Sequence, residues 1–145
     1  MKKIILFVSL LSFLLISCRN AVNPDLVKKE IFDTEKAFEA MVAEKGMAEG
    51  FWYFADENAV ILRGNDSIIS GKDGIRNYYE KRARPDVKVT WTPDYINVSD
   101  DGTLGYTYGK YTYFIPDSTG KTSELKGIFH TVWKKTDEGW RYLWD

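Results

Sequence analysis

The sequence has very few of the residues from which metal sites and crosslinks are usually built. Its 145 residues include one cysteine, one histidine and four prolines. A single cysteine excludes a disulfide framework within the chain. One histidine without a second cysteine cannot supply the nitrogen and sulfur ligands of a typical zinc site. The calcium-loop pattern Asp-x-Asp-x-Asp-Gly is also missing. We therefore expect no metal ion.

An excess of positive charge is missing as well. The chain has 20 basic and 21 acidic residues, for a formal net charge of −1, and no block of basic residues. This balance argues against nucleic acid as a partner. The nearest approach to a phosphate-binding loop is the segment from Gly64 to Lys72, but its glycines are too far apart and Asp73 stands where serine or threonine is needed. We expect no cofactor.

Long hydrophobic runs are absent except at the start of the sequence. Lys2 and Lys3 precede an apolar stretch, Ile4 to Ile16, that only two serines interrupt. This stretch is shorter than the roughly 20 residues that span a bilayer. A basic start followed by a short apolar segment and small residues is typical of a secretory signal peptide.

The end of that stretch specifies the kind of signal. The letters LISC at positions 15–18 resemble a bacterial lipobox, in which the cysteine receives lipid and becomes the mature N-terminus. We predict a lipoprotein signal peptide at 1–17, lipidation of Cys18, a tether at 18–23 and one domain at 24–145. The protein would be exported and lipid-anchored to a bacterial membrane, facing the periplasm or at the cell surface. The alternative is an ordinary signal peptide that carries a cysteine.

The first part of the domain predicts a long amphipathic helix. Asn23 can cap its start, Pro24 suits the first helical position, and Gly46 can end it in a left-handed conformation. Apolar or small residues recur at steps of three and four, which predicts one buried stripe. The stripe consists of Val27, Ile31, Thr34, Phe38 and Met41 or Val42.

Two shorter helices are predicted downstream. The segment 47–54 carries four consecutive aromatic residues, so we expect a helix that is apolar on all sides and bent or broken near Gly50. The segment 71–84 has helical spacing and is stopped by Pro85.

Strands make up most of the remaining sequence. The turn sequences DDG, PDSTGK and TDEG separate runs rich in β-branched and aromatic residues. Helices followed by strands indicate an α+β domain in which helices cover one face of an antiparallel sheet. The predicted strands are 58–63, 67–70, 87–99, 103–115, 122–135 and 140–145.

Three motifs carry a resemblance to a known family: FADENAVIL at 54–62, SGKDGIRNYY at 70–79 and WKKTDEGWRYLWD at 133–145. Their order and spacing resemble the nuclear-transport-factor-2-like superfamily, closest to its SnoaL-like branch and to domain of unknown function 4440. The resemblance implies a cystatin-like α+β fold, in which a cone-shaped, strongly curved antiparallel sheet wraps around two to three N-terminal helices. It also implies a small molecule in the mouth of the cone. Members of the superfamily include isomerases, cyclases, dehydratases and non-catalytic assembly domains, so the fold alone does not specify a function.

The catalytic pattern of the ketosteroid isomerases, which belong to this superfamily, is not present. Their acidic base falls on Ile61–Arg63, where no acid stands. Their first-helix tyrosine corresponds to Phe38 or a neighbour, and their second acid falls near Phe129–Thr131, which again lacks one. Proton transfer needs a base and a donor at fixed places, so that site does not carry over.

Aromatic residues are abundant: five tryptophans, nine tyrosines and eight phenylalanines. Alternation along 103–115 puts Tyr106, Tyr108 and Lys110 on one face of the sheet, and Tyr111 and Tyr113 on the other. Such rings could line a ligand site, or they could fill the core and the interface of a homodimer formed through the sheet. A cation inside the cone would favour an anionic ligand, whereas a cation at the rim would not. The candidate ligand-binding residues are Trp52, Tyr53, Arg63, Tyr78, Tyr106, Tyr108 and Lys110.

His130 is the candidate catalytic residue because a nearby carboxylate, Asp145, could pair with it as an acid–base device. The register of the last hairpin decides whether they meet. A four-residue loop at 136–139 places His130 opposite Asp145. The commoner three-residue loop at 137–139 places Thr131 there instead, and we favour it.

Three functions follow as hypotheses. The first is a membrane-anchored pocket domain that binds a small, partly apolar organic molecule. The second is an isomerase, dehydratase or cyclase in which His130 exchanges protons with the substrate. The third is a non-catalytic module that dimerises or binds a partner through its sheet. The fold resemblance and the abundance of aromatic residues motivate the first hypothesis, and a sheet with aromatic residues on both faces motivates the third.

Overall fold

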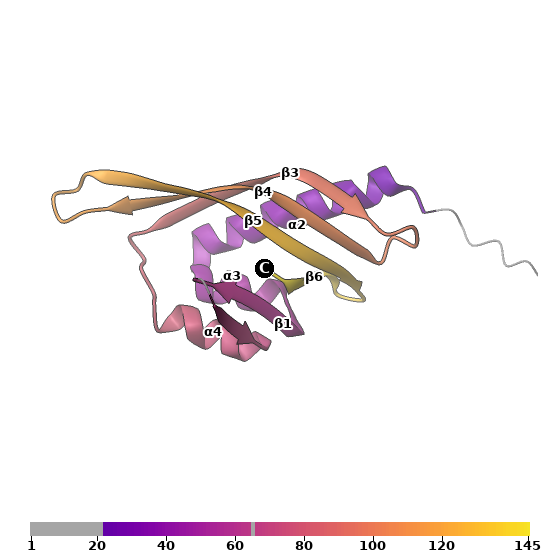
Figure 1. Ribbon diagram of the computed structural model, residues 1–145, viewed down its shortest axis with the longest axis horizontal. Coiled ribbons are helices and arrows are strands. Elements are labelled where there is room, and N and C mark those ends of the chain that lie inside the picture. Colours follow the sequence, from indigo (N-terminus) through magenta and orange to yellow (C-terminus); the bar gives the residue numbers. More distant parts are fainter. Residues whose placement is uncertain (1–21, 65) are drawn as a thin grey trace, which may run out of the picture.

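The computed structural model describes residues 22–64 and 66–145 as three helices packed against a six-stranded sheet (Figure 1). The predicted signal peptide and Cys18 lie outside these residues. The elements are α2 (Pro24–Lys45), α3 (Met47–Phe54), β1 (Ala55–Arg63), β2 (Ser67–Ser70), α4 (Lys72–Glu80), β3 (Lys88–Val98), β4 (Leu104–Pro116), β5 (Thr122–Thr136) and β6 (Gly139–Trp144).

The sheet is curved and does not close into a barrel. Its strand order is β2-β1-β6-β5-β4-β3, so β2 and β3 form the two edges. All pairs are antiparallel except β1 and β6, which run parallel. The helices lie on one side, with α2 running along the sheet and α4 beside β1 and β2 (Figure 1). The predicted α+β class and curved sheet around N-terminal helices are confirmed.

Helix α2 begins and ends at the predicted residues. The side chain of Asn23 accepts a hydrogen bond from the backbone N–H of Asp25 at 3.0 Å, and Gly46 ends the helix with a φ of 87°. The predicted stripe is wrong at one position. Thr34 bonds back to the carbonyl of its own helix, and the residue beside it, Glu35, is buried instead. Residues four positions apart lie on the same face of a helix, so Glu35 shares the buried face of Val27 and Ile31.

Helix α3 is continuous through Gly50, contrary to the predicted break. The glycine is required for close packing, because a Cβ there would lie 2.4 Å from a methyl group of Val42 on α2. The four consecutive aromatic residues of α3 are buried to different extents. Phe51 and Phe54 are buried, whereas Tyr53 is exposed at the surface.

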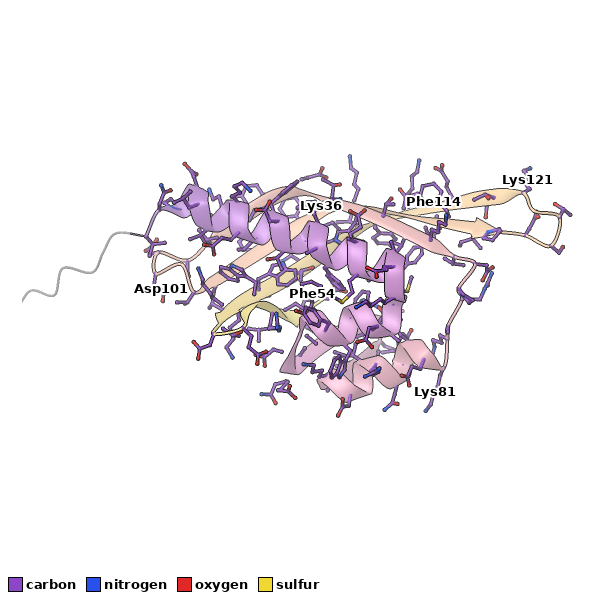
Figure 2. The ribbon with its side chains drawn as sticks, turned by 180° about the vertical axis from the view of Figure 1, so that it is seen from behind. Lys36, Phe54, Lys81, Asp101, Phe114 and Lys121 are labelled. Carbon is purple, nitrogen blue, oxygen red and sulfur yellow. The ribbon has the colours of Figure 1, made fainter. Side chains whose placement is uncertain are left out.

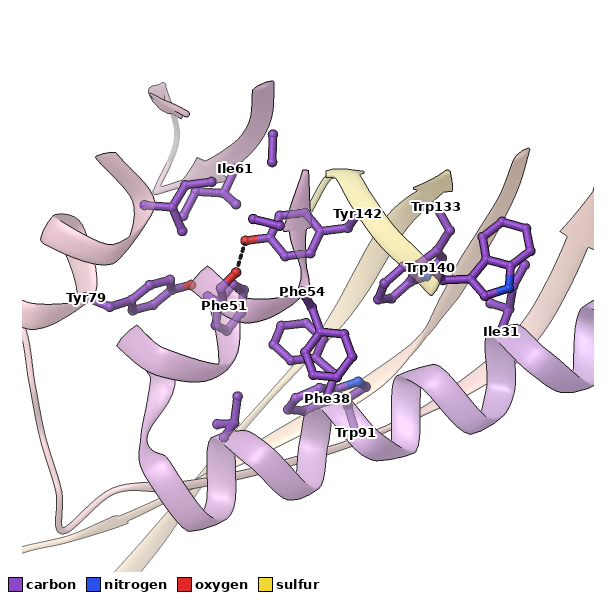
Figure 3. Packing of buried hydrophobic residues seen from close by; sticks show 14 of the residues in the cluster. Ile31, Phe38, Phe51, Phe54, Ile61, Tyr79, Trp91, Trp133, Trp140 and Tyr142 are labelled. Carbon is purple, nitrogen blue, oxygen red and sulfur yellow. Dashed lines mark hydrogen bonds between the residues drawn. The ribbon is translucent and has the colours of Figure 1, made fainter. Parts of the chain in front are cut away.

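The core is a cluster of aromatic rings around Phe38 (Figure 3). The edges and faces of neighbouring rings meet: the ring centroids of Phe38 and Phe51 are 4.8 Å apart at 74°, and those of Phe38 and Trp91 are 5.1 Å apart at 76°. This geometry suits the charge distribution of aromatic rings. The hydroxyl of Tyr142 donates to the carbonyl of Phe51 at 2.8 Å, so the polar atom of that ring is satisfied inside the core.

The β4–β5 hairpin is longer than its neighbours and projects beyond the helices. Its turn, which includes Lys121, lies at the far end of the molecule (Figures 1 and 2). β5 pairs with β4 over 122–134 but with β6 only over 132–136. The edge of β5 that would face β6 is therefore open from Thr122 to Thr131.

The last hairpin has a register that neither predicted loop describes completely. Thr136 pairs with Gly139 across a two-residue turn, which continues the register of the four-residue loop. A bulge at Leu143 then shifts the pairing by one residue. As a result Asp145 lies beside Thr131, whose hydroxyl donates to its carboxylate at 3.1 Å. The favoured neighbour of Asp145 is correct, but the bulge and not the turn produces it.

Candidate ligand-binding cavity

A cavity of about 410 Å³ lies where β6 ends, between the open edge of β5 and the end of β1. This volume is within the range of small-molecule sites. Its walls are largely aromatic and come from helices and strands far apart in the sequence. The rings that line it are Phe38, Phe51, Trp91, Tyr111, Tyr113, Phe129 and Trp144.

An ion pair forms the polar end of this cavity. A guanidinium nitrogen of Arg63 lies 2.5 Å from a carboxylate oxygen of Asp145, and both side chains are mostly covered, with 23% and 13% of their surface exposed. The parallel pairing of β1 and β6 brings them together. The N–H of Leu62 donates to the main-chain carbonyl of Asp145 at 2.9 Å, and the N–H of Asp145 donates to Val60 at 3.1 Å.

Arg63 has further partners on the helix side. Its Nε donates to the hydroxyl of Tyr79 at 2.7 Å, and its guanidinium lies over the ring of Phe51 at 5.3 Å. Burial alone would lower the pKa of Arg63, but the carboxylate of Asp145 and the Tyr79 oxygen outweigh it and raise the pKa. Burial also raises the pKa of Tyr79, so its hydroxyl stays protonated. Arg63 is a permanent cation held in one place by its neighbours.

Two tyrosines of β4 line the cavity. Among residues 22–64 and 66–145, neither Tyr111 nor Tyr113 forms a side-chain hydrogen bond to another group of the chain. Burial raises the pKa of Tyr113, although the charge of Arg63 opposes that rise. The ring of Tyr111 lies against Gly127 of β5, where a Cβ would be only 2.3 Å from the hydroxyl oxygen. Gly127 therefore makes room for this wall.

A buried carboxylate holds one of the cavity-lining rings, Trp91, in position. Glu35 is 1% exposed and accepts hydrogen bonds from the indole N–H of Trp91 at 2.8 Å, from that of Trp133 at 3.0 Å and from the hydroxyl of Thr107 at 2.5 Å. Burial raises the pKa of Glu35 to about 6, and these three hydrogen bonds limit the rise. Sequence reasoning missed Glu35. Its four-residue step from Ile31 was the available signal.

The comparison with family models covers most of this domain. The model of the SnoaL-like domain matches residues 43–143. The chain belongs to the SnoaL-like domain family. No curated protein matches the sequence significantly.

Solved structures of other members of the superfamily share the fold of this SnoaL-like domain at low sequence identity. An NTF2-like protein with a cystatin-like fold from Novosphingobium aromaticivorans aligns with a TM-score of 0.69 and 15% identity, over 99% of this chain and 86% of that one. The association domain of CaMKII from C. elegans aligns with a TM-score of 0.67 and 13% identity, over 83% and 94%. A domain of unknown function with a cystatin-like fold from Nostoc punctiforme aligns with a TM-score of 0.68 and 16% identity, over 84% of this chain and 76% of that one. These likenesses establish the fold only.

Of the predicted site residues of this SnoaL-like domain, Arg63 and His130 line the cavity. His130 is exposed and stands at the rim. It does not meet Asp145, whose carboxylate contacts Arg63 and Thr131. The proposed acid–base pair is therefore not formed, and a catalytic role for His130 stays a prediction.

Three other predicted residues lie on the helices and outside the cavity lining. The indole N–H of Trp52 donates to Asp73 at 3.1 Å. Tyr53 lies beneath the guanidinium of Arg141 at 5.1 Å. Tyr78 lies beneath another arginine of the surface. Each ring thus covers a charged side chain, and none of the three lines the cavity.

The remaining three predicted residues, Tyr106, Tyr108 and Lys110, are exposed on the face of the sheet that points away from the helices. Tyr106 borders a shallow groove there together with His130. Tyr108 stacks on Tyr95 of β3, with ring centroids 5.2 Å apart. The predicted alternation of β4 is confirmed, and the tyrosines that line the cavity are those on the other face.

Within the described ranges, no group of three or more metal-ligating side chains comes together. No helix in the described part of the chain is both long enough and apolar enough to cross a bilayer.

Proposed function

We propose that this SnoaL-like domain binds a small, partly apolar organic molecule in the cavity between β1, β5 and the helices. The observation that carries the proposal is a 410 Å³ space lined by seven aromatic rings, with one polar end at Arg63 and Asp145. Sites for small molecules typically combine apolar walls with a few fixed polar groups. Both charged groups are held by main-chain pairing of β1 and β6, so the site is formed before a ligand arrives.

The proposal is tested by identifying bound molecules and by paired variants of one strand. Native mass spectrometry of the purified protein, followed by a thermal-shift screen, finds candidate ligands. Tyr111→Ala removes a wall of the cavity and is expected to weaken binding by roughly tenfold. Tyr108→Ala, on the opposite face of β4, is the matched control and leaves binding unchanged. Equal effects of the two variants would contradict the assignment of this cavity.

We further propose that Cys18 carries lipid and holds this pocket at the surface of a bacterial membrane. The support is the Lys2-Lys3 start, the short apolar stretch and the lipobox-like residues 15–18. Stable anchoring needs more than one acyl chain, at about 0.8 kcal/mol per buried methylene. When cells are grown with a radiolabelled fatty acid, the native protein should take up the label and the Cys18→Ser variant should not. An unlabelled native protein would refute the anchor.

A second function, self-association through the sheet, is supported by a separate observation. Tyr95, Tyr106, Tyr108 and Leu104 expose large apolar surfaces on the outer face, and contiguous patches of this kind mark interfaces. The C. elegans relative is an association domain by name. Light scattering of the native protein and of Tyr106→Glu tests it. A native monomer at high concentration would count against a homodimer.

A further inference from the structure

The positive charge at the polar end of the cavity is already compensated by a carboxylate of the protein. One terminal nitrogen of Arg63 pairs with the Asp145 carboxylate at 2.5 Å, and the other donates to main-chain carbonyls of Asp145 at 3.3 Å and Leu62 at 2.7 Å. Its Nε is bonded to Tyr79. A ligand anion that approached the remaining N–H of the nitrogen bound to Asp145 would lie beside that carboxylate. Arg63 is therefore a poor anion receptor, although an uncompensated cation inside the cone would favour an anionic ligand.

The surroundings make an anion still less favourable. The other walls are mainly rings and aliphatic side chains, including Leu62 and Val89, which cannot solvate a charge. An incoming carboxylate would also lie close to the carboxylate of Asp145, and two like charges in a poorly solvated site repel each other strongly.

Uncharged hydrogen-bonding groups have partners here. The hydroxyls of Tyr111 and Tyr113 can donate to a ligand oxygen, and the Asp145 carboxylate, which Thr131 bonds only weakly at 3.1 Å, can accept from a ligand hydroxyl. Ring stacking on the aromatic walls supplies the apolar contact.

We propose that the cavity selects uncharged aromatic molecules that carry a hydroxyl or carbonyl group, and that Asp145 is the residue that excludes carboxylates. This inference rests on the proposed function, because it names the ligand class of the same site. It assigns Asp145 a role in specificity: the residue neutralises Arg63 and repels anions.

Three naphthalene derivatives of nearly equal size test the charge preference. 2-Naphthol, 2-naphthoate and 2-naphthylmethylammonium are titrated into the protein at neutral pH by calorimetry. The native protein is expected to bind the naphthol at least about tenfold more tightly than the naphthoate. Naphthoate binding as tight as naphthol binding would overturn the inference while leaving the proposed function in place. Failure of all three probes to bind would overturn the proposed function itself.

The variant Asp145→Asn tests the role of the carboxylate. It leaves Arg63 without its side-chain counter-ion, so the ratio of naphthoate to naphthol affinity should rise by roughly tenfold or more. Glu138→Gln, which neutralises an exposed acid in the turn of the same hairpin, is the matched control and keeps the native ratio. An unchanged ratio in folded Asp145→Asn would refute the proposal.

Arg63→Gln provides an independent readout should Asp145→Asn fail to fold. Without the guanidinium, the carboxylate of Asp145 is uncompensated. Naphthoate should then bind more weakly than to the native protein, and the ammonium probe should gain at least about tenfold. No gain for the ammonium probe would refute the proposal in the same way.

Discussion

Two of the carboxylates that the described residues shield from bulk water, those of Glu35 and Asp145, are compensated in opposite ways. Glu35, on the face of α2 that packs against strands β3 to β5, receives three hydrogen bonds from neutral donors, and among the described residues no cation forms an ion pair with it. Asp145, at the open end of the cavity, faces the cation Arg63. Neutral donors suffice to fix the position of Glu35, but they do not remove the free-energy cost of burying its charge. The difference teaches that one group organises the core, whereas the other sets the charge of the site.

The largest expected effect comes from removing the buried carboxylate. Glu35→Ala leaves the indole N–H groups of Trp91 and Trp133 without acceptors and creates a void between α2 and the sheet. The free energy of unfolding should fall by about 3 kcal/mol, as measured by urea denaturation. Asp33→Asn, on the exposed side of the same helix, is the control. A loss below about 1 kcal/mol would mean that the donors find other acceptors.

The absence of a cation near Glu35 predicts an unusual dependence of stability on pH. Its folded-state pKa of about 6 is above the ordinary value of 4.5, so the folded state binds the proton more tightly than the unfolded state. Folding stability from this group is therefore lower at pH 7 and rises as pH falls from about 6 to 4.5, by about 2 kcal/mol in total.

The measurement compares native protein with Glu35→Gln, which has nearly the same shape and no titratable group at this position. The difference in their free energies of unfolding is followed from pH 7.5 to 4.5. It should shift in favour of the native protein as the pH falls. A constant difference across this range would show that Glu35 does not titrate there.

The paired carboxylate should matter less for stability. Asp145→Asn leaves Arg63 with its bonds to Tyr79 and to main-chain carbonyls, and 23% of its side chain reaches solvent. We expect a loss of about 1.5 kcal/mol in the free energy of unfolding, visible as a lower midpoint in urea. A loss larger than that of Glu35→Ala would reverse the comparison between the two sites.

The predictability of the two regions from sequence also differs. The ends of α2 could be predicted because Asn23, Pro24 and Gly46 act through neighbouring backbone groups. The two faces of β4 could be predicted because successive side chains of a strand point to opposite faces of the sheet. The four-residue step from Ile31 indicated the buried face for Glu35, but a carboxylate alone indicates a surface position, and its hydrogen-bond partners could not be predicted. Its indole and hydroxyl partners come from β3, β4 and β5, which only the fold brings to it.

The cavity was predictable in part. Arg63 was selected as a candidate because a cation inside the cone would favour an anionic ligand, and the structure places it in the lining of the cavity. Its partner was not predictable, because the bulge at Leu143 sets where Asp145 lies and has no marker in the sequence. Tyr111 and Tyr113 were placed on the inner face, but the tyrosines of the outer face were chosen as candidates. The predicted signal peptide and the lipid on Cys18 stay predictions.

The parallel pairing of β1 with β6 has a consequence for how the chain folds. Within the sheet, β1 and β2 are joined to the other strands only through β6, the last strand along the sequence. The sheet is therefore divided into two pieces until residues 139–144 have been synthesised and inserted between them. Contacts between segments so distant along the chain form slowly, because a long loop must close first. The exposed edges of the two pieces are open to pairing with other chains during that interval, so nascent or truncated chains that lack β6 should aggregate far more readily than the finished domain.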